Sequence, residues 1–515
     1  ALLLIRKRCR PDSRLPFAPW IVLADAASLL EISLGLLSLI RPRKLRTSTH
    51  VFPAIAANLC AFLLVTVVGL SGFSSIDLEQ ALDFGFDRWQ PITTYTSQGF
   101  ITSFTEMVNE LPIEKPEDYT PDEAQSIEQE LAAAYDSTYG SSEQRAAAVA
   151  QFNEIKPTIV AVMNESFSDL SCFEQLQAAG YTGPAFYNSL PDTLVRGTML
   201  ASVTGGGTAN SEFEFLTGAT TAFVGLGKIP YQLYQMNGVN SLAKDLKELG
   251  YTATAMHPQN PVNYHRDKIY QQLGFGDFLS IGDFEGAPCY HAGVCDYATY
   301  DKILDLLRTD EAPQFIFDVT MQNHGGYDYG TVPAEELTNY WVEGASEGAN
   351  SALNTYLTCI NASDRDLEYF INELRNIGRP VVLVFFGDHQ PSAATTLNDE
   401  LYPQEDTASH AFRVYQSTYF VWANYEIAGN TELNVYDTVG ANEIAAITLN
   451  KIGAPLTDYQ KALLATRSDV PTINVAGYLG ADGLRYDLES EDSPYTSTID
   501  KLQRMQYLEF ASKVQ

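Results

Sequence analysis

Residues 381–391 read Val-Val-Leu-Val-Phe-Phe-Gly-Asp-His-Gln-Pro, and the first six of them decide the fold class. An unbroken run of apolar and β-branched residues is typical of a strand that is buried on both faces of a sheet. Strand-like runs of the same kind occur at 158–162, 251–255 and 315–320. Helical patterns lie at 241–249 and 351–377. Apolar strands that alternate with helices predict an α/β domain with a largely parallel central sheet flanked by helices.

The 515-residue chain has a basic head and an acidic body. Residues 1–73 hold 9 Lys and Arg against 3 Asp and Glu, and the remaining residues hold 23 against 61. Because nucleic acid binding needs a cationic surface, this composition excludes nucleic acid as the partner of the body. The six cysteines show no zinc-finger spacing. Cys289 and Cys295 flank a short loop, and the sequence leaves open whether they are bridged.

A membrane anchor is predicted ahead of the α/β domain. Residues 51–73 carry no charge and are long enough to cross a bilayer. Basic residues precede this span and acidic residues follow it, so the positive-inside rule places the rest of the chain outside the cytoplasm. Residues 15–40 are a weaker candidate because Asp25 and Glu31 interrupt them. This stretch could cross the membrane, lie at its interface, or pack against other helices.

We therefore expect a multi-pass plasma-membrane protein with three parts. The predicted parts are a transmembrane region at 1–73 that is truncated at its N-terminus, a helical acidic stalk at 74–155, and an extracellular domain at 156–515. In the stalk, Thr120-Pro-Asp-Glu resembles a helix start, with Pro121 in the first turn and acids near the positive end of the helix dipole.

Two polar clusters follow predicted strands. Glu165 comes just after the run at 158–162, and Asp388 and His389 follow the run at 381–386. Because ligands of such sheets bind beyond the carboxyl ends of the strands, these side chains can converge on one divalent cation. Mixed oxygen and nitrogen ligands suit Mn²⁺ or Zn²⁺ better than Ca²⁺. The alternative is that Asp388 caps a helix and Glu165 lies in a solvated loop.

A third cluster is the glycine loop Gly205-Gly-Gly-Thr208, which leads into a predicted helix. Free backbone N–H groups and the dipole at the start of a helix would hold a phosphate. A hydroxyl beside a metal ion in that field loses its proton more easily, which makes Thr208 a candidate nucleophile. The alternative is a simple helix-capping threonine.

Two more loops complete the set. In the loop at 256–267, Arg266 could grip a phosphate and Tyr264 could pack against a small polyol. In the loop at 322–327, His324 could act as a general acid or stabilise a leaving group. Each could also be an ordinary surface loop. Taken together, however, the five clusters supply metal ligands, a nucleophile, a phosphate clamp and an acid, which predicts a metal-dependent phosphotransferase or hydrolase.

The five segments together resemble the lipoteichoic acid synthase family, in the sulfatase-like branch of the alkaline phosphatase superfamily. The motifs lie in the order of that family between residues 157 and 425: N-E-S-F, G-G-G-T-A-N-S-E-F, N-Y-H-R-D-K-I-Y, N-H-G-G-Y and G-D-H-Q-P. The resemblance implies that Glu165, Thr208, Asp388 and His389 surround one divalent ion, Mn²⁺ ahead of Zn²⁺ or Mg²⁺. It also implies that Thr208 becomes covalently modified and that residues 156–515 form a sulfatase-like catalytic domain.

The resemblance further implies a substrate pocket lined by Arg266, Tyr264, His324, His257 and Gln259. Two of these residues depart from the family pattern. Tyr264 stands where synthases commonly have a tryptophan, and Gln259 stands where an acidic residue commonly contacts the glycerol. The departures leave the fold and the chemistry in place but weaken the assignment of the head group.

The activity implied is transfer of glycerol phosphate from phosphatidylglycerol, a membrane lipid, through a phospho-threonine to a glycolipid or polyol-phosphate acceptor. The alternatives are a phosphoethanolamine transferase, a phosphoglycerol transferase acting on glucans, a sulfatase-like hydrolase, and a non-catalytic binding protein. A true sulfatase needs a Cys or Ser within a C/S-x-P-x-R motif, whereas the chain has Thr-Ala-Asn-Ser-Glu from Thr208 on.

Overall fold

The computed structural model describes residues 91–100, 103–104, 111–328 and 331–514, which belong to two compact units. The first unit ends at Ile113 and contains helix α5 (Pro91–Gln98), and the second runs from Glu114 to Gln515. The predicted spans at 15–40 and 51–73 lie outside the described residues. Among the described residues, no helix has the length and apolar character needed to cross a membrane.

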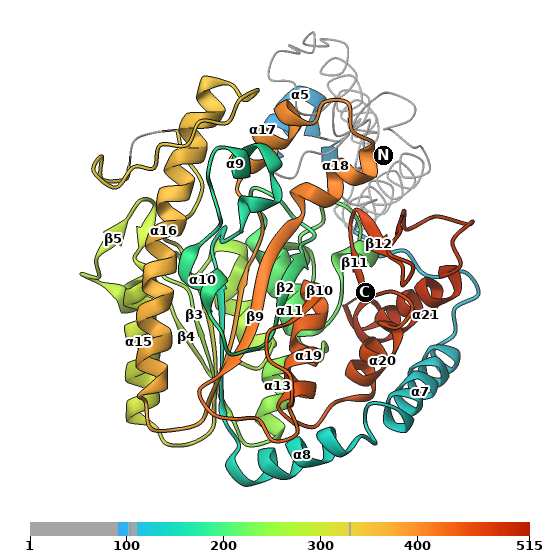
Figure 1. Ribbon diagram of the computed structural model, residues 1–515. Helices are drawn as coiled ribbons and strands as arrows, with labels where there is room; N and C mark the ends of the chain where they lie inside the picture. The colour runs from blue at the N-terminus through green and yellow to red at the C-terminus, as the bar shows by residue number, and fades with distance from the viewer. Residues whose placement is uncertain (1–90, 101–102, 105–110, 329–330, 515) are drawn as a thin grey trace, which may run out of the picture. The chain divides into compact units, whose positions relative to one another are not determined.

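The second unit is built on an eight-stranded sheet (Figure 1). Its strands, in spatial order, are β10 (Val435–Gly440), β2 (Thr193–Leu200), β9 (Gln416–Ala423), β8 (Val381–Gly387), β1 (Thr158–Asn164), β7 (Gln314–Val319), β3 (Thr252–Met256) and β4 (Asp277–Leu279). Every neighbouring pair is parallel except the two pairs that β9 makes. The predicted α/β fold with a largely parallel sheet is confirmed, and each predicted strand run is a strand.

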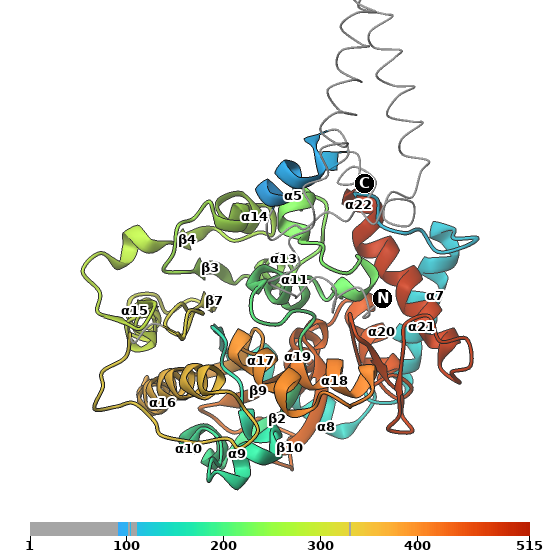
Figure 2. The same cartoon turned by 90° about the horizontal axis from the view of Figure 1, so that it is seen from above.

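Helices cover both faces of the sheet, as the view down its edge shows (Figure 2). On one face, α15 (Asp296–Thr309) and α16 (Glu347–Arg375) pack against each other and against the large core cluster. On the other face lie α11 (Thr208–Thr217), α13 (Leu242–Glu248) and α19 (Ile444–Lys451). Phe215 of α11 contacts rings from β7 and β8, which fixes this helix on the sheet.

Residues 114–155 pack within the second unit. Helix α7 (Pro121–Ser137) begins as predicted, with the Thr120 hydroxyl accepting a hydrogen bond from the amide of Glu123 at 3.2 Å. It packs against α20 (Asp458–Thr466) and α21 (Thr496–Gln506), and α8 (Glu143–Ile155) leads into β1. The division into a stalk at 74–155 and a domain from 156 stays a prediction.

Shorter elements complete the second unit. The helices are α9 (Glu174–Ala178), α10 (Ala185–Ser189), α12 (Pro230–Leu233), α14 (Arg266–Gln272), α17 (Ser392–Leu401), α18 (Thr407–Val414) and α22 (Ser512–Val514). The small antiparallel sheets are β11 (Thr472–Asn474), β12 (Gly477–Leu479) and β13 (Arg485–Tyr486), and the hairpin β5 (Cys289–Tyr290) with β6 (Gly293–Val294). Cys289 and Cys295, which belong to this hairpin region, are both free thiols in the structure.

Candidate active site

The predicted metal ligands meet at the carboxyl edge of the sheet. Strands β1 and β8 are neighbours with Asn164 opposite Gly387, so the residues that follow them, Glu165 and Asp388, emerge side by side. Glu165, Asp388 and His389 each offer a ligand atom, and these atoms lie within 4.8 Å of one another. All three side chains are buried. The structure therefore brings together Glu165, Asp388 and His389, which were predicted to converge from the ends of two strands.

The backbone around the cluster is shaped to present Asp388. A Cβ on Gly387 would stand 1.7 Å from the carbonyl oxygen of Phe167, so only glycine fits there. Ser166 adopts a left-handed conformation with φ 54°, which aims its amide at Asp388. Asp388 Oδ1 accepts hydrogen bonds from the amides of Ser166 and His389, at 2.7 and 2.9 Å. With Oδ1 occupied in this way, Oδ2 is the oxygen left to face the cluster.

The hydrogen bonds of His389 fit a metal ligand. Its Nδ1 lies 2.9 Å from the carbonyl oxygen of Gln390, which can only accept, so Nδ1 carries a proton, and in the neutral ring Nε2 presents the lone pair that a metal ion needs. Nε2 lies 3.1 Å from Asp388 Oδ2, and neither atom has a hydrogen-bond partner among the described residues. Two buried lone pairs this close repel each other, and a divalent cation beside both, with Glu165 as third ligand, would satisfy them.

The electrostatics of the cluster agree with this geometry. Burial, together with the neighbouring charge of Glu165, raises the pKa of Asp388 to about 6. A cation bound beside Asp388 would favour its ionised form and oppose the effect of burial. The donor set therefore fits an ion such as Mn²⁺ or Zn²⁺, which accepts oxygen and nitrogen ligands together.

Thr208 lies at the first position of α11, beside the cluster. The loop before it is tied to the metal-ligand loop because the amide of Gly205 donates to the carbonyl of Gln390 at 2.8 Å. Gly207, not Thr208, is the cap residue of the helix, and the Thr208 hydroxyl makes no capping bond, so the capping alternative is wrong. Instead the hydroxyl donates to Glu165 Oε2 at 3.5 Å. The candidate nucleophile thus faces the predicted metal ligands at the positive end of a helix.

Arg266 is fixed by a residue that the sequence analysis missed. Its Nε donates to Oε1 of Glu212 at 2.9 Å, and its Nη2 donates to the same oxygen. Both side chains are buried, and the hydroxyl of Tyr270 donates to Glu212 Oε2 at 2.7 Å. Glu212 holds one side of the guanidinium, so the end formed by Nη1 and the second Nη2 proton is the part left for an anion. Glu212 lies one helical turn after Thr208, and that spacing is the signal that could have identified it.

The other predicted substrate residues surround this arginine. The Tyr264 ring lies over the guanidinium of Arg266 at 5.0 Å, and burial raises the pKa of Tyr264. His257 is buried with Nδ1 2.8 Å from the carbonyl oxygen of Val319, and burial, then Arg266, lowers its pKa well below the usual value, so it is neutral. His324 lies close enough to add to that lowering, and its own side chain is exposed.

Gln259 does not reach the cluster through any hydrogen bond of the described residues. Its side-chain oxygen accepts a hydrogen bond from the amide of Asn260 at 2.9 Å, within the same loop. A second residue missed by the sequence analysis, Asn323, supports Glu165 instead. Its amide donates to the backbone carbonyl of Glu165 and to the side chain of Asn164, both at 3.2 Å. Its place beside His324 in the loop after β7 was the available signal.

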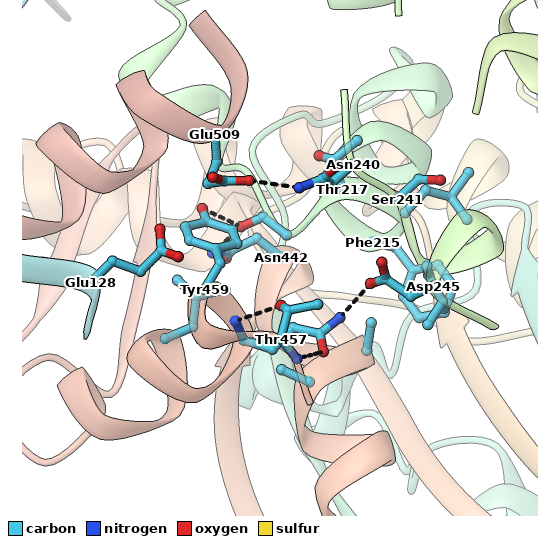
Figure 3. Close-up of a pocket in the computed structure, with 17 residues that line it drawn as sticks. Glu128, Phe215, Thr217, Asn240, Ser241, Asp245, Asn442, Thr457, Tyr459 and Glu509 are labelled. Atoms are coloured by element: carbon cyan, nitrogen blue, oxygen red, sulfur yellow. Dashed lines mark hydrogen bonds between the residues drawn. The ribbon is translucent and has the colours of Figure 1, made fainter. Parts of the chain in front are cut away.

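A separate cavity of about 100 Å³ lies at the opposite end of α11 (Figure 3). Glu128, Asp245, Tyr459 and Glu509 are among the residues that line it. Burial and the charge of Glu509 raise the pKa of Glu128 to about 7, and burial raises that of Asp245 to about 6. None of the predicted site residues lines this cavity, so it is distinct from the candidate active site.

Comparison with known proteins places the chain among enzymes of this fold. The sequence family described as Sulfatase matches residues 157–444. A putative cyclic β-1,2-glucan modification protein of Rhizobium meliloti (strain 1021) is 30% identical over 254 residues, which are 49% of this chain and 38% of that protein. The capsular polysaccharide biosynthesis protein RkpI of the same strain is 25% identical over 46% of this chain and 42% of its own length. The chain thus matches less than half the length of these curated relatives.

Two solved structures share the fold. The Streptococcus pyogenes phosphoglycerol transferase GacH, in complex with sn-glycerol-1-phosphate, aligns with a TM-score of 0.59 and 23% identity over 77% of this chain and 95% of its own. The lipoteichoic acid synthase LtaP from Listeria monocytogenes aligns with a TM-score of 0.50 and 16% identity over 74% of this chain and 98% of its own. At these identities the likeness to the two structures shows a shared fold and nothing further about this chain.

Proposed function

The chain belongs to the sulfatase family, and on that premise we propose that it is a membrane-anchored phosphoglycerol transferase with Thr208 as its nucleophile. The observation that carries the proposal is the hydrogen bond from the buried Thr208 hydroxyl to Glu165, in a cluster where Asp388 Oδ2 and His389 Nε2 have no hydrogen-bond partner within the described part of the chain. Hydrolysis of sulfate esters is disfavoured, because Thr208 is not the Cys or Ser of the C/S-x-P-x-R motif that sulfatases need. The resemblance of the motifs to lipoteichoic acid synthases supports phosphatidylglycerol as donor.

The first half-reaction follows from the position of Thr208. Its Oγ attacks the phosphorus of phosphatidylglycerol, the Oγ–P bond forms, and the bond from phosphorus to the diacylglycerol oxygen breaks. The hydroxyl proton leaves along the hydrogen bond toward Glu165, and His324 can give a proton to the departing oxygen. Arg266, held by Glu212, neutralises a phosphate oxygen. Glu165, Asp388 and His389 would hold the divalent ion, proposed to be Mn²⁺, which supplies positive charge and acidifies the hydroxyl.

In the second half-reaction the hydroxyl of an acceptor attacks the same phosphorus and releases Thr208. The acceptor is a glycolipid, a polyol phosphate or another saccharide. The relationship at 30% identity to a protein named for glucan modification supports a saccharide. A plasma-membrane location, with the domain outside the cytoplasm, follows from the charge-free span at 51–73 and is part of the proposal.

Intact-mass measurement tests the proposal. The full chain in detergent is incubated with phosphatidylglycerol and Mn²⁺, and we expect a glycerophosphate adduct that is absent from Thr208→Ala. The matched control is Thr217→Ala at the other end of α11, and it should form the adduct, because the Thr217 hydroxyl donates to the Phe213 carbonyl and accepts from the amide of Ala219, away from the cluster. A wild-type chain that binds Mn²⁺ but gains no mass, or an adduct that persists in Thr208→Ala, contradicts the proposal.

A further inference from the structure

The segment at 336–342, between β7 and α16, presents a tryptophan to solvent. The Trp341 side chain is 63% exposed, and it has no hydrogen bond, ring stacking or cation–π partner among the described residues. Leu337 in the same segment is also exposed. A single exposed apolar residue needs no explanation, but the backbone that carries this one is held unusually firmly.

Two buried asparagines of α16 grip the residues on either side of Trp341. Asn354 accepts from the amide of Tyr340 at 2.7 Å and donates to its carbonyl at 2.8 Å. Asn350, one turn earlier, does the same to Val342, at 2.7 and 3.1 Å. The two asparagine side chains thus make the hydrogen bonds that a neighbouring strand would make in a sheet, although the segment itself belongs to no sheet. The indole projects from a backbone that is fixed both immediately before and immediately after it.

Further contacts hold the same segment in place. The amide of Thr338 donates to the Thr358 hydroxyl at 3.0 Å, a third grip one turn further along α16. The Tyr340 ring packs edge-on against Tyr181 at 5.6 Å, and Val342 is fully buried. The side chain of Trp341 is therefore the part of this segment that contributes least to the fold. A rigid, exposed aromatic ring loses little conformational entropy when a ligand covers it.

The surroundings of Trp341 indicate the chemistry of that ligand. Glu335 and Glu343, which flank the segment, are exposed, and the whole body of the chain is strongly acidic. Negative charge at this surface disfavours anionic lipid and polyanionic chains. Carboxylates beside an aromatic face instead suit the hydroxyls and the apolar ring face of an uncharged sugar. A neutral glycan fits this surface better than a lipid head group or a phosphate polymer.

The distance from the cluster sets the length of the ligand. The amide of Ser346, four residues after the segment, donates to Glu400 in the last turn of α17 at 2.7 Å. Helix α17 starts at Ser392, three residues after His389, and contacts α16. Ser392 and Glu400 are eight residues apart along α17, which at 1.5 Å per residue is roughly 12 Å, and Trp341 lies a further five residues before Ser346. A molecule that reaches both Trp341 and the cluster is an oligomer and not a small alcohol.

We propose that Trp341 is the stacking platform of an acceptor subsite for a neutral oligosaccharide, outside the catalytic pocket. The inference rests on the proposed function, because it names the class of the acceptor that discharges phospho-Thr208. The glycan lies with one sugar ring on the indole and a hydroxyl further along the chain at the phosphorus. Its attack forms the new phosphate ester and returns the electron pair and a proton to Thr208 Oγ.

The test compares two acceptors with one preformed adduct. The glycerophosphate adduct on Thr208 of the full chain is discharged either with a linear β-linked glucan oligosaccharide or with glycerol. Glycerol is too short to touch both Trp341 and the metal-ligand cluster. In Trp341→Ala the glucan concentration for half-maximal discharge should rise about five-fold or more. The ratio of the discharge efficiency of glucan to that of glycerol should fall accordingly. Trp341→Phe should restore most of the ratio, because it keeps a ring. Leu484→Ala, which removes an equally exposed apolar side chain elsewhere, should keep it.

Three results would overturn the inference. In the first, Trp341→Ala leaves the glucan concentration for half-maximal discharge unchanged; in the second, it weakens discharge by glycerol as much as discharge by glucan. In the third, Trp341→Ala slows only the formation of the adduct from lipid, which would make Trp341 a lipid contact. If the wild-type chain forms no adduct, the proposed function fails while the subsite is still tested by calorimetry. Glucan binding to the chain carrying Thr208→Ala should weaken when Trp341→Ala is added, and equal affinities would contradict the subsite.

Discussion

The pair formed by Glu212 and Arg266 allows a quantitative test of how the nucleophile helix and the phosphate clamp are joined. Glu212 is fully buried and Arg266 is 2% exposed, so the pair has little access to water. Glu212→Gln keeps the shape of the side chain but leaves the guanidinium buried without a counter-charge. Removing one partner of a buried ion pair costs about 3–5 kcal/mol in the free energy of unfolding. The hydroxyl of Tyr270 loses its charged acceptor in the same step.

The assay is urea unfolding of the detergent-solubilised full chain, followed by near-ultraviolet circular dichroism. Arg266→Met should cost a similar amount, because it leaves Glu212 buried and unpaired. The double variant should cost clearly less than the two single variants together, with a coupling of about 2 kcal/mol or more. The surface pair of Arg308 and Glu373, 2.9 Å apart and largely exposed, is the control, and Glu373→Gln should cost less than about 1 kcal/mol. Additive costs at Glu212 and Arg266 would refute the coupling.

Three further outcomes can be measured. Asp388→Ala should abolish Mn²⁺ binding by calorimetry while the far-ultraviolet spectrum stays that of the wild type; retained metal would refute its role as a ligand. Gly387→Ala should lower the melting temperature sharply or prevent folding, because its Cβ would meet the Phe167 carbonyl 1.7 Å away; wild-type stability would contradict this. Burial and Glu509 raise the folded pKa of Glu128 to about 7, so its contribution to stability is present at low pH and is lost as the pH rises through that value. Glu128→Gln should therefore raise the melting temperature at pH 8 and not at pH 5, with a gain in the free energy of unfolding of at most about 1–2 kcal/mol after allowance for solvent screening; equal effects at both pH values would exclude this cause.

The parts of the fold that the sequence predicted are those that local pattern controls. The runs at 158–162 and 381–386 are strands because unbroken apolar residues can be buried only in the middle of a sheet. Once both runs are parallel strands, the polar residues after them must share one edge, which is why Glu165, Asp388 and His389 could be grouped without coordinates. Helix α16 begins at 347, four residues before the predicted start, because Ser346 caps it.

The parts that the sequence did not predict depend on contacts between distant segments. The spacing from Thr208 places Glu212 on the same side of the predicted helix, but only the approach of Arg266, 54 residues later, makes Glu212 a buried ion-pair partner. Asn323 likewise becomes a support of Glu165 only when β7 lies beside β1. The role of Asn350 and Asn354 could not be read from the sequence. Two asparagines spaced by one helical turn can lie on an exposed helix face as well as on a buried one.

The buried position of Thr208 bears on how two substrates can share one site. Residue Thr208 is 7% exposed, so in the proposed reaction the donor lipid and the acceptor cannot both surround its hydroxyl. In an in-line displacement the leaving oxygen departs opposite the attacking one. When phospho-Thr208 is resolved, Oγ is the leaving atom, and the acceptor must enter from the position that diacylglycerol vacated. The catalytic pocket then has to accommodate both molecules in turn and cannot be shaped closely to either. Selection of the acceptor must come from contacts further out, and the rigid indole of Trp341 lies in such a place.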